Sequence, residues 1–340
     1  MRRGKSAVLM SFVVAIGLVL LASSTWGQAK PIELSYSIFF PAPHKHTVLA
    51  TEWAKEIEKR TNGRVKINMF PGGTLTPADK CYDGVVQGIS DIGMSVLAYT
   101  RGKFPLTEVI DLPLGYKSGA AATRLVNEYY EKFKPKELGE VRIMYLHAHG
   151  PGILHTKKPV TKLEELKGLK IRSTGLSSKV VAALGGTPVA MPMGETYDAL
   201  SRGVAEGSMA PIEALQGWKW GEVVKSTTEN FGSAYSTAFF VAMNKDKWNA
   251  LPPDIQKVFD EVNREWIDKT GKTWDQIDKS GRDFTLGLGN KIIQLSKEED
   301  GRWAKAVKPI LDEYVSNMKA KGLPGEEALK FCQERLKALQ

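Results

Sequence analysis

Residues 82–94, YDGVVQGISDIGM, recur in modified form as residues 197–209, YDALSRGVAEGSM. The two stretches share the Tyr-Asp start, a central glycine (Gly88 and Gly203), an acidic residue near the end and a final methionine. A Gly-Gly-Thr sequence stands shortly before each stretch. Each stretch predicts a helix that ends at a glycine and leads into a short strand. The repeat favours two related α/β units, with chance similarity of two common helix-to-strand turns as the alternative.

The N-terminal third predicts alternating strands and helices. Residues 32–38 alternate apolar and polar side chains, which is typical of a strand with one buried face. Apolar residues recur every fourth position from Leu49 to Ile57, which predicts an amphipathic helix that ends near Asn62. Residues 65–69 predict the next strand. Strand, helix and strand in succession indicate a parallel α/β layer with crossover helices.

Two such units leave a cleft between them, and ligands bind at the carboxyl ends of strands in folds of this kind. The chain is expected to cross from one unit to the other at 147–152, HAHGPG, directly after a strand that covers 141–146. Glycines there suit a hinge. An ordinary Gly-Pro turn explains the same sequence equally well.

The C-terminal third predicts helices. The sequence LPPD at 251–254 indicates the start of a long helix that continues past Trp274 and is long enough to lie across both units. Further helices are expected at about 297–321 and from 325 to the end. We therefore expect a first unit formed by 30–148 plus about 240–280, and a second unit formed by 149–239 plus about 281–340.

Residues 1–29 have the composition of a secretory signal peptide. Three basic residues precede the apolar run 7–22, which is shorter than the roughly 20 residues that a membrane-spanning helix needs. Small residues around Gly27 suit cleavage, so the mature chain should be exported and begin near Gln28 or Lys30. An uncleaved signal anchor is the alternative.

The composition is that of a globular protein with a modest positive charge. The formal net charge is +9, and removal of the three basic residues of the leader leaves +6. This surplus favours attraction of anions. Basic and acidic residues alternate along the helical segments, which excludes a nucleic-acid partner. The two cysteines, Cys81 and Cys332, are consistent with one disulfide and with two buried free thiols.

The motifs of common enzyme classes are absent from the sequence. It contains no Gly-x-Ser-x-Gly elbow, no phosphate-binding loop and no Cys-x-x-Cys pair. Two His-x-His sequences, at 44–46 and 147–149, place two imidazoles on one face of a strand, but no carboxylate or cysteine accompanies them. We expect no enzyme activity, no metal and no cofactor. A periplasmic metalloenzyme that uses these pairs is the alternative.

Arg172 is the strongest candidate for a ligand-binding residue. It ends the predicted strand 169–172, and residues 173–178 lead from it into a helix. A guanidinium at the carboxyl end of a strand, beside the free N–H groups of a helix start, suits a bidentate grip on a carboxylate. A plain structural ion pair is the alternative.

Four segments are distinctive: FPGGTL at 70–75, LKGLKIR at 166–172, GVAEG at 203–207 and LPPDIQK at 251–257. Together they resemble the solute-binding proteins of TRAP (tripartite ATP-independent periplasmic) transporters of the dicarboxylate-binding, or DctP, type. The resemblance covers nearly all of the mature chain. It implies an α/β fold like that of type II periplasmic binding proteins, with two α/β domains, a cleft between them and a long helix spanning both.

The resemblance also implies a function. Such a protein captures an organic acid and delivers it to the large and small membrane subunits of a sodium-coupled permease, and it is expected to act as a monomer. A ligand-binding sensor subunit is an alternative that would use the same pocket.

The resemblance assigns roles to individual residues of this chain. Arg172 matches the carboxylate-clamping arginine of the family, and Met193 stands where an aromatic residue often stacks on the ligand. Phe39, Ser95 and Tyr99 match pocket-lining positions of the first unit. The remaining expected ligand-binding residues are His149, Ala210 and Phe239.

Two departures from the family bear on the ligand. Gly152 stands where many members that bind sugar acids or dicarboxylates carry a second arginine, and Ala210 replaces an asparagine before a proline. These losses predict a roomier and more apolar far end of the pocket. Trp218 and Trp220 are candidates to extend its wall, with packing of helices as their alternative role. We therefore expect a monocarboxylate with an apolar or aromatic tail instead of a C4-dicarboxylate or a sialic acid.

Overall fold

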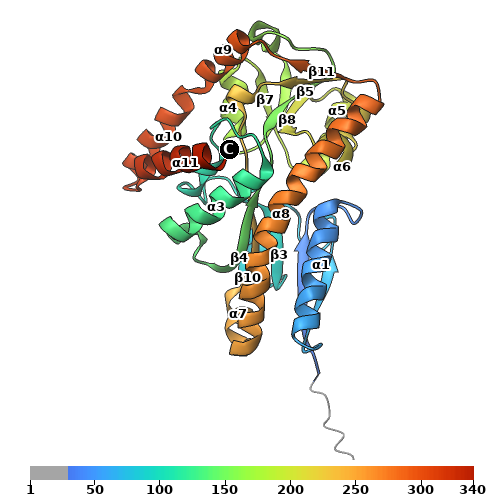
Figure 1. Ribbon diagram of the computed structural model, residues 1–340, viewed down its shortest axis with the longest axis vertical. Helices are drawn as coiled ribbons and strands as arrows, with labels where there is room; N and C mark the ends of the chain where they lie inside the picture. The colour runs from blue at the N-terminus through green and yellow to red at the C-terminus, as the bar shows by residue number, and fades with distance from the viewer. Residues whose placement is uncertain (1–29) are drawn as a thin grey trace, which may run out of the picture.

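A computed structural model describes residues 30–340, so the expected leader, 1–29, lies outside the described residues. The chain forms two β-sheets, one in the lower and one in the upper half of Figure 1. The first sheet has the strand order β2-β1-β3-β10-β4. Its strands are β1 (Ile32–Ile38), β2 (Val65–Phe70), β3 (Ile92–Val96), β4 (Val141–Ala148) and β10 (Ala238–Asn244).

The second sheet has the strand order β11-β9-β5-β8-β6-β7. Its strands are β5 (Gly152–Thr156), β6 (Lys170–Ser173), β7 (Thr187–Ala190), β8 (Gly207–Pro211), β9 (Ser226–Glu229) and β11 (Lys291–Gln294). The expected two-domain α/β fold, with a cleft between the domains, is confirmed.

The two sheets share one pairing pattern. In the first, β1 pairs in parallel with β2 and β3, β3 pairs antiparallel with β10, and β10 pairs antiparallel with β4. In the second, β6 pairs in parallel with β7 and β8, β8 pairs antiparallel with β5, and β5 pairs antiparallel with β9. The sequence repeat falls on equivalent elements, because β3 follows α2 (Cys81–Val86) and β8 follows α5 (Met193–Arg202).

The glycine of each repeat ends its helix in the same way. Gly88 has a φ of 73° and Gly203 a φ of 77°, in the left-handed region that favours glycine. Helices α1 (Lys45–Arg60) and α4 (Ser177–Ala183) are the corresponding crossovers from β1 to β2 and from β6 to β7. The two halves are therefore copies of one α/β unit.

Two short segments of the chain cross between the sheets, in addition to the long helical connection from β10 to β11. One crossing runs from Ala148 to Gly152, as expected, and the other runs from Glu229 to Ala238. The two crossings contact each other, because the Gly152 N–H donates to the Tyr235 carbonyl at 2.7 Å. The strand after each of these crossings, β5 or β10, pairs antiparallel with strands of the sheet that it enters. Neither half is therefore built from one continuous segment.

Helix α8 (Pro253–Gly287) connects the two halves along one side of the molecule (Figure 1). It contacts α1, α3 (Gly119–Phe133) and β4 in one half, and α6 (Ala214–Gly217) and β11 in the other. Glycines allow this close packing. A Cβ at Gly281 would lie 2.4 Å from the Ile212 carbonyl oxygen, and one at Gly271 would lie 3.0 Å from the Ala120 Cα.

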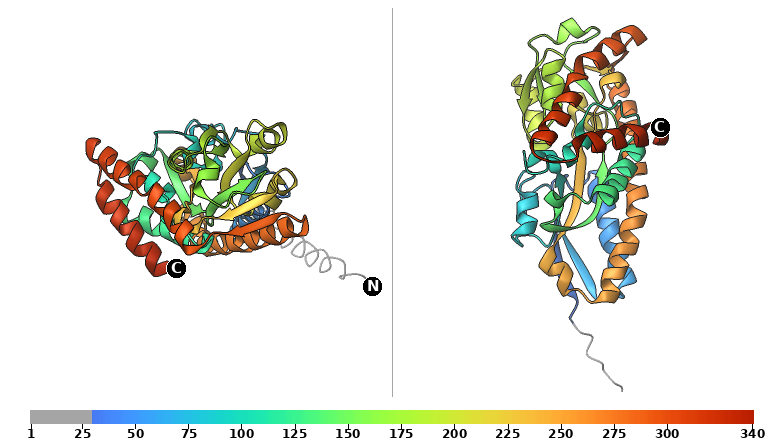
Figure 2. Two further views of the ribbon diagram at one scale, coloured as in Figure 1. Left: turned by 90° about the horizontal axis from the view of Figure 1, so that it is seen from above. Right: turned by 90° about the vertical axis from the view of Figure 1, so that its left-hand side faces the viewer.

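The prediction of a single helix at 297–321 is wrong. Two helices form there, because Pro309 lacks the N–H that an uninterrupted helix needs at this position. Figure 2 shows the chain returning from the upper half toward the middle through these helices. The C-terminal helices are α9 (Lys297–Val307), α10 (Pro309–Ala320) and α11 (Gly325–Leu339). The short helix α7 (Lys245–Ala250) comes earlier in the chain, directly before α8.

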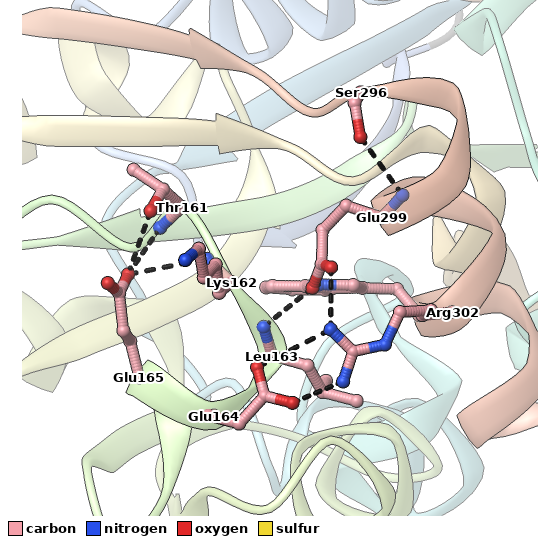
Figure 3. Close-up of polar contacts among 9 residues, drawn as sticks. Thr161, Lys162, Leu163, Glu164, Glu165, Ser296, Glu299 and Arg302 are labelled. Carbon is pink, nitrogen blue, oxygen red and sulfur yellow. Dashed lines mark hydrogen bonds and ion pairs between the residues drawn. The ribbon is translucent and has the colours of Figure 1, made fainter.

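The expected division into two sequence-defined units stays a prediction. Helix α11, which that division assigns to the second unit, packs on α3 beside the first sheet. Helix α9 stays with the second half, where Arg302 binds Glu164 and Glu299 (Figure 3). The Glu299 carboxylate also accepts the Leu163 N–H at 2.7 Å. The C-terminal segment therefore contacts both halves.

Large aromatic residues fill the interior. Trp53, Trp220, Trp274 and Trp303 are among the fully buried side chains.

Cys81 and Cys332 are both buried and free, so the alternative with two free thiols holds. In the part of the chain from 30 to 340, no helix has the length and apolar character needed to span a membrane.

Candidate functional site

A narrow cavity, with a free volume of about 30 Å³, lies between the two halves. Residues that follow β1 and β3 line it from the first half, and residues at the ends of β6 and β8 line it from the second. The lining residues are Phe39, Phe40, Val96, Tyr99, His149, Arg172, Thr174, Met193, Ala210, Pro211, Glu213, Tyr235, Thr237, Phe239 and Trp274.

Arg172 carries a buried positive charge in this cavity. The side chain is 2% exposed, and its Nε and Nη2 donate to the Met191 carbonyl oxygen at 3.0 and 2.8 Å. The guanidinium lies 5.7 Å from the centre of the Trp220 ring. Among residues 30–340, no carboxylate forms an ion pair with it. A buried charge is costly without a counterion, so a ligand carboxylate would supply the missing partner.

Aromatic rings form the first-half side of the cavity. Phe39 stacks on Phe239 and on Trp218, with ring centres 6.3 and 6.0 Å apart, and meets Tyr99 edge-on at 5.9 Å. Phe40 stacks on His44 at 4.2 Å. Stacked and edge-on rings are favourable packing geometries for an aromatic guest as well as for each other.

Tyr99 connects the two sides of the cavity. Its hydroxyl oxygen accepts the Met193 N–H at 3.1 Å. Burial raises the pKa of the Tyr99 hydroxyl, and the positive charge of Arg172 acts in the opposite direction. The phenol therefore stays protonated beside the guanidinium and can donate its own proton to a bound oxygen atom.

His44 and Glu213 form a second contact across the cleft. The His44 Nδ1 accepts the His46 N–H at 3.2 Å, so Nε2 bears the proton that it donates to the Glu213 Oε2 at 3.1 Å. Both side chains are buried. Asp278 of α8 accepts the Glu213 N–H at 3.1 Å, and burial, followed by the charge of Glu213, raises the pKa of the Asp278 carboxyl.

His149 borders the cavity close to Arg172. Its Nδ1 lies 2.6 Å from the Gly150 carbonyl oxygen, and a carbonyl only accepts, so Nδ1 bears a proton. Burial lowers the pKa of the His149 imidazole to about 4. The ring is therefore neutral at pH 7.

His155 supports the second-half side from behind. Its Nε2 donates to the Ala210 carbonyl at 3.1 Å, and its Nδ1 accepts the Thr227 hydroxyl at 2.9 Å. Burial lowers the pKa of this imidazole to about 4. The neutral ring fixes the backbone of β8 where Ala210 faces the cavity.

Seven of the eight predicted ligand-binding residues line the cavity: Phe39, Tyr99, His149, Arg172, Met193, Ala210 and Phe239. The eighth, Ser95, is buried beside it, and its hydroxyl donates to the Ala78 carbonyl at 2.6 Å. Trp218 stacks behind Phe39, and Trp220 lies against Arg172, so neither forms the cavity surface itself.

The sequence prediction missed several residues that line the cavity. Glu213 lies two residues beyond Pro211, but a single acidic residue carries no signal. The sequence predicts Trp274 only as part of the long helix, and its spacing on α8 is that of a buried helix face. Tyr235 belongs to the second crossing, which has no sequence signature.

The expected extra room at Gly152 is absent. A Cβ at Gly152 would lie 2.3 to 2.7 Å from atoms of the Tyr235 ring, so this ring already fills the space. The Tyr235 hydroxyl donates to the Met209 carbonyl at 2.9 Å and holds the ring there. Replacement of arginine by glycine at this position therefore removes charge without enlarging the pocket.

The His-x-His pairs pack as aromatic rings. His46 stacks on His147 with centres 5.5 Å apart, and the Trp274 Nε1–H donates to the His147 Nδ1 at 3.1 Å. No group of three or more His, Cys, Asp and Glu side chains suited to a metal ion occurs among the described residues. The metalloenzyme alternative has no support.

A larger and more open groove, of about 950 Å³, lies on the outer surface along β4, α3 and α8. Arg142 pairs with Asp260 at 2.7 Å, and Arg335 pairs with Glu128 at 2.7 Å. Arg142 and Arg335 of this groove are thus already paired with carboxylates of the protein. Of these two sites in residues 30–340, the cleft is the one that combines a buried cation lacking a carboxylate partner with an apolar wall.

Known proteins share both the sequence and the shape of this chain. Residues 39–317 match the model of the bacterial extracellular solute-binding protein family 7. The C4-dicarboxylate-binding periplasmic protein of Rhodobacter capsulatus is 26% identical, over 94% of this chain and 97% of its own length.

Two solved structures of TRAP solute-binding proteins are similar. The protein of Bordetella bronchiseptica, with bound (R)- and (S)-mandelate, is 31% identical with a TM-score of 0.85, over 91% of this chain and 100% of that one. The protein of Rhodoferax ferrireducens, with copurified benzoate, is 27% identical with a TM-score of 0.86, over 91% and 98%. The chain belongs to family 7 of the bacterial extracellular solute-binding proteins, the DctP-type binding proteins of TRAP transporters.

Proposed function

We propose that this protein binds an organic monocarboxylate with an aromatic or apolar tail and delivers it to the membrane subunits of a TRAP transporter. The observation that carries the proposal is the buried guanidinium of Arg172, which has no carboxylate partner in the described part of the chain. In the proposed complex the ligand carboxylate bonds to Arg172 and Tyr99. The tail lies against Phe39 and Phe239.

The second charge of a C4-dicarboxylate would find no matching cation. Arg172 is the only Arg or Lys among the cavity-lining residues described here, and Glu213 carries the opposite charge. The relatives crystallised with mandelate and benzoate support the preference for aromatic monocarboxylates. The ligand-binding set is Phe39, Tyr99, His149, Arg172, Met193, Ala210 and Phe239, with Ser95 supporting the wall.

The family also supports the proposed cellular setting. Its members are extracellular solute-binding proteins, and we propose that residues 1–29 of this chain are a cleaved leader that directs it to the periplasm. The proposed partners are one large and one small membrane subunit, and the proposed binding form is a monomer.

Thermal unfolding of residues 30–340 with a panel of acids tests the binding step. Benzoate, phenylacetate and mandelate are compared with succinate and malate, with benzamide as the uncharged match for benzoate. A ligand at 100 times its dissociation constant adds about 2.7 kcal/mol of stability. The aromatic acids should raise the unfolding temperature, whereas benzamide should not. Stabilisation by succinate alone, or by no acid of the panel, would contradict the proposal.

Delivery is tested with the membrane subunits in proteoliposomes. Uptake of the radiolabelled acid should require this protein and an inward sodium gradient. Uptake that proceeds equally well without the protein would rule out the proposed role in delivery.

A further inference from the structure

The cavity contains an acceptor that the carboxylate of the ligand cannot use. The His149 Nδ1 proton is held by the Gly150 carbonyl at 2.6 Å, so in the neutral ring Nε2 has a lone pair and no proton. This Nε2 forms no hydrogen bond within residues 30–340, yet it is not among the polar atoms sealed from solvent. It is therefore accessible to solvent, and the residue that carries it lines the cavity.

The orientation of the His149 ring is fixed by its neighbours. It meets the rings of Tyr235, Trp274 and Phe239 at steep angles of 89°, 65° and 80°, with centres 5.4 to 6.3 Å apart. The His149 carbonyl oxygen accepts the Ser236 hydroxyl at 2.7 Å. Packing on these sides and the bond to Gly150 keep the ring from turning its protonated nitrogen toward the cavity.

The His149 imidazole stays neutral over the physiological range. Burial lowers its pKa to about 4, and the positive charge of Arg172 contributes in the same direction. An anionic ligand would offset part of the effect of Arg172 on the pKa of His149. Burial, however, is the largest cause of the lowered pKa. An unpaired acceptor buried by a closed cleft costs free energy unless the ligand donates to it.

We infer that the preferred ligand carries a hydroxyl group that donates to the His149 Nε2, which makes the natural ligand class hydroxylated aromatic monocarboxylates. This inference rests on the proposed function of the same cavity. Arg172 and Tyr99 bind the acid group, the aromatic side holds the ring, and His149 selects the hydroxyl. The hydroxyl can be aliphatic, next to the carboxylate, or phenolic.

Glu213 is the charged competing acceptor in the cavity, which the hydroxyls of Thr174 and Thr237 also line. Its Oε2 already accepts the His44 Nε2 proton at 3.1 Å, so part of its accepting capacity is used. A neutral nitrogen is also a better neighbour for an anionic ligand than a second carboxylate is. The two acceptors are distinguishable by mutation.

Isothermal titration with matched acids tests the inference. Mandelate and 3-hydroxyphenylacetate are each compared with phenylacetate, which lacks the hydroxyl, and with their methyl ethers, which accept but cannot donate. At least one hydroxy acid should bind about tenfold more tightly than phenylacetate and than its own ether. In His149→Phe, which keeps a ring but has no acceptor, that ratio should fall to about one.

Each outcome has a distinct meaning. Tight and equal binding of phenylacetate and the hydroxy acids by the wild type would overturn the inference and leave the proposed function intact. The inference would also fail if the ethers bound as well as the hydroxy acids, or if Glu213→Leu, which has no acceptor, abolished the ratio while His149→Phe kept it. Absence of binding by every acid would remove the proposed function, and the inference with it. Because the ether comparison uses the wild type alone, it holds even if His149→Phe does not fold.

Discussion

The two sides of the cleft have the same topology but opposite chemistry. The side built on the first sheet presents rings, among them Phe39 and Phe239. The side built on the second sheet presents the buried charges of Arg172 and Glu213. A duplicated scaffold has thus been divided into an apolar half and an electrostatic half. Affinity for the acid group and selectivity for the tail should therefore be separable by mutation.

The largest effect is expected on the electrostatic side. Arg172→Met should weaken binding of benzoate or mandelate by about 100-fold or more, because a ligand charge would be buried without a partner. The free protein should be at least as stable as the wild type, because the mutation removes an unpaired buried charge. Titration calorimetry and urea unfolding measure both quantities. Loss of stability without loss of affinity would mean that Arg172 has a structural role.

The next effect tests the contact between the two crossings, where the two sides join. Gly152→Ala should destabilise the protein by about 2 to 3 kcal/mol, because the new Cβ would lie 2.3 Å from the Tyr235 ring. Gly194→Ala is the matched control, since no atom lies within 4 Å of the added Cβ, and its effect should stay within about 0.5 kcal/mol.

Urea unfolding compares these two variants and a double variant. Tyr235→Leu added to Gly152→Ala should recover part of the lost stability by freeing space. If Gly152→Ala and Gly194→Ala behave alike, the close packing of Tyr235 on the crossing is not a constraint.

A smaller effect concerns the pH dependence behind the electrostatic side. The folded-state pKa of His155 is about 4, below the 6.5 of an unfolded chain, so the unfolded state takes up the proton first as the pH falls. Stability from this residue is complete above pH 6.5 and is lost between pH 6.5 and 4. Between pH 7.5 and 5.0 the wild type should lose about 2 kcal/mol more than His155→Gln.

Urea unfolding at several pH values measures that difference directly. The comparison between wild type and variant cancels the contribution of other buried groups, such as Asp278, whose raised pKa acts in the opposite direction. Parallel pH profiles for the two proteins would show that His155 is not the titrating group.

The smallest effect is expected on the aromatic side. Phe39→Leu should weaken benzoate binding about fivefold, because stacking on an aromatic ring is worth about 1 kcal/mol beyond burial. The affinity for cyclohexanecarboxylate, which has a saturated ring of similar shape, should fall less in Phe39→Leu than the affinity for benzoate. Titration of both acids against both proteins gives the selectivity. An equal loss for the two acids would indicate that Phe39 contributes packing without selectivity for aromatic rings.

The fold could be predicted where the sequence carries local patterns. Apolar and polar residues alternate in β1, and apolar residues stand at every fourth position in α1. These patterns, like the repeat across α2–β3 and α5–β8, reflect burial on one face of a regular element. The split of the C-terminal helix at Pro309 was missed, although its cause is local, because the apolar spacing continues on both sides of the proline.

The site was predictable in part, for a different reason. Arg172 stands at the end of a recognisable strand within a family motif, so both local pattern and resemblance locate it. Tyr235 was missed because its effect depends on a contact with Gly152 in a separate crossing. The acceptor role of His149 depends on the Gly150 carbonyl and on burial, and neither is visible in a sequence.

Helix α8 restricts how the protein can move. At 1.5 Å per residue, its 35 residues form a rod about 50 Å long that is seated on backbone atoms at Gly271 and at Gly281. Opening of the cleft must then bend this rod, in addition to turning the two crossings. We expect the elastic resistance of the rod to limit the opening angle, so that a released ligand leaves through a narrow gap and not from two freely jointed lobes.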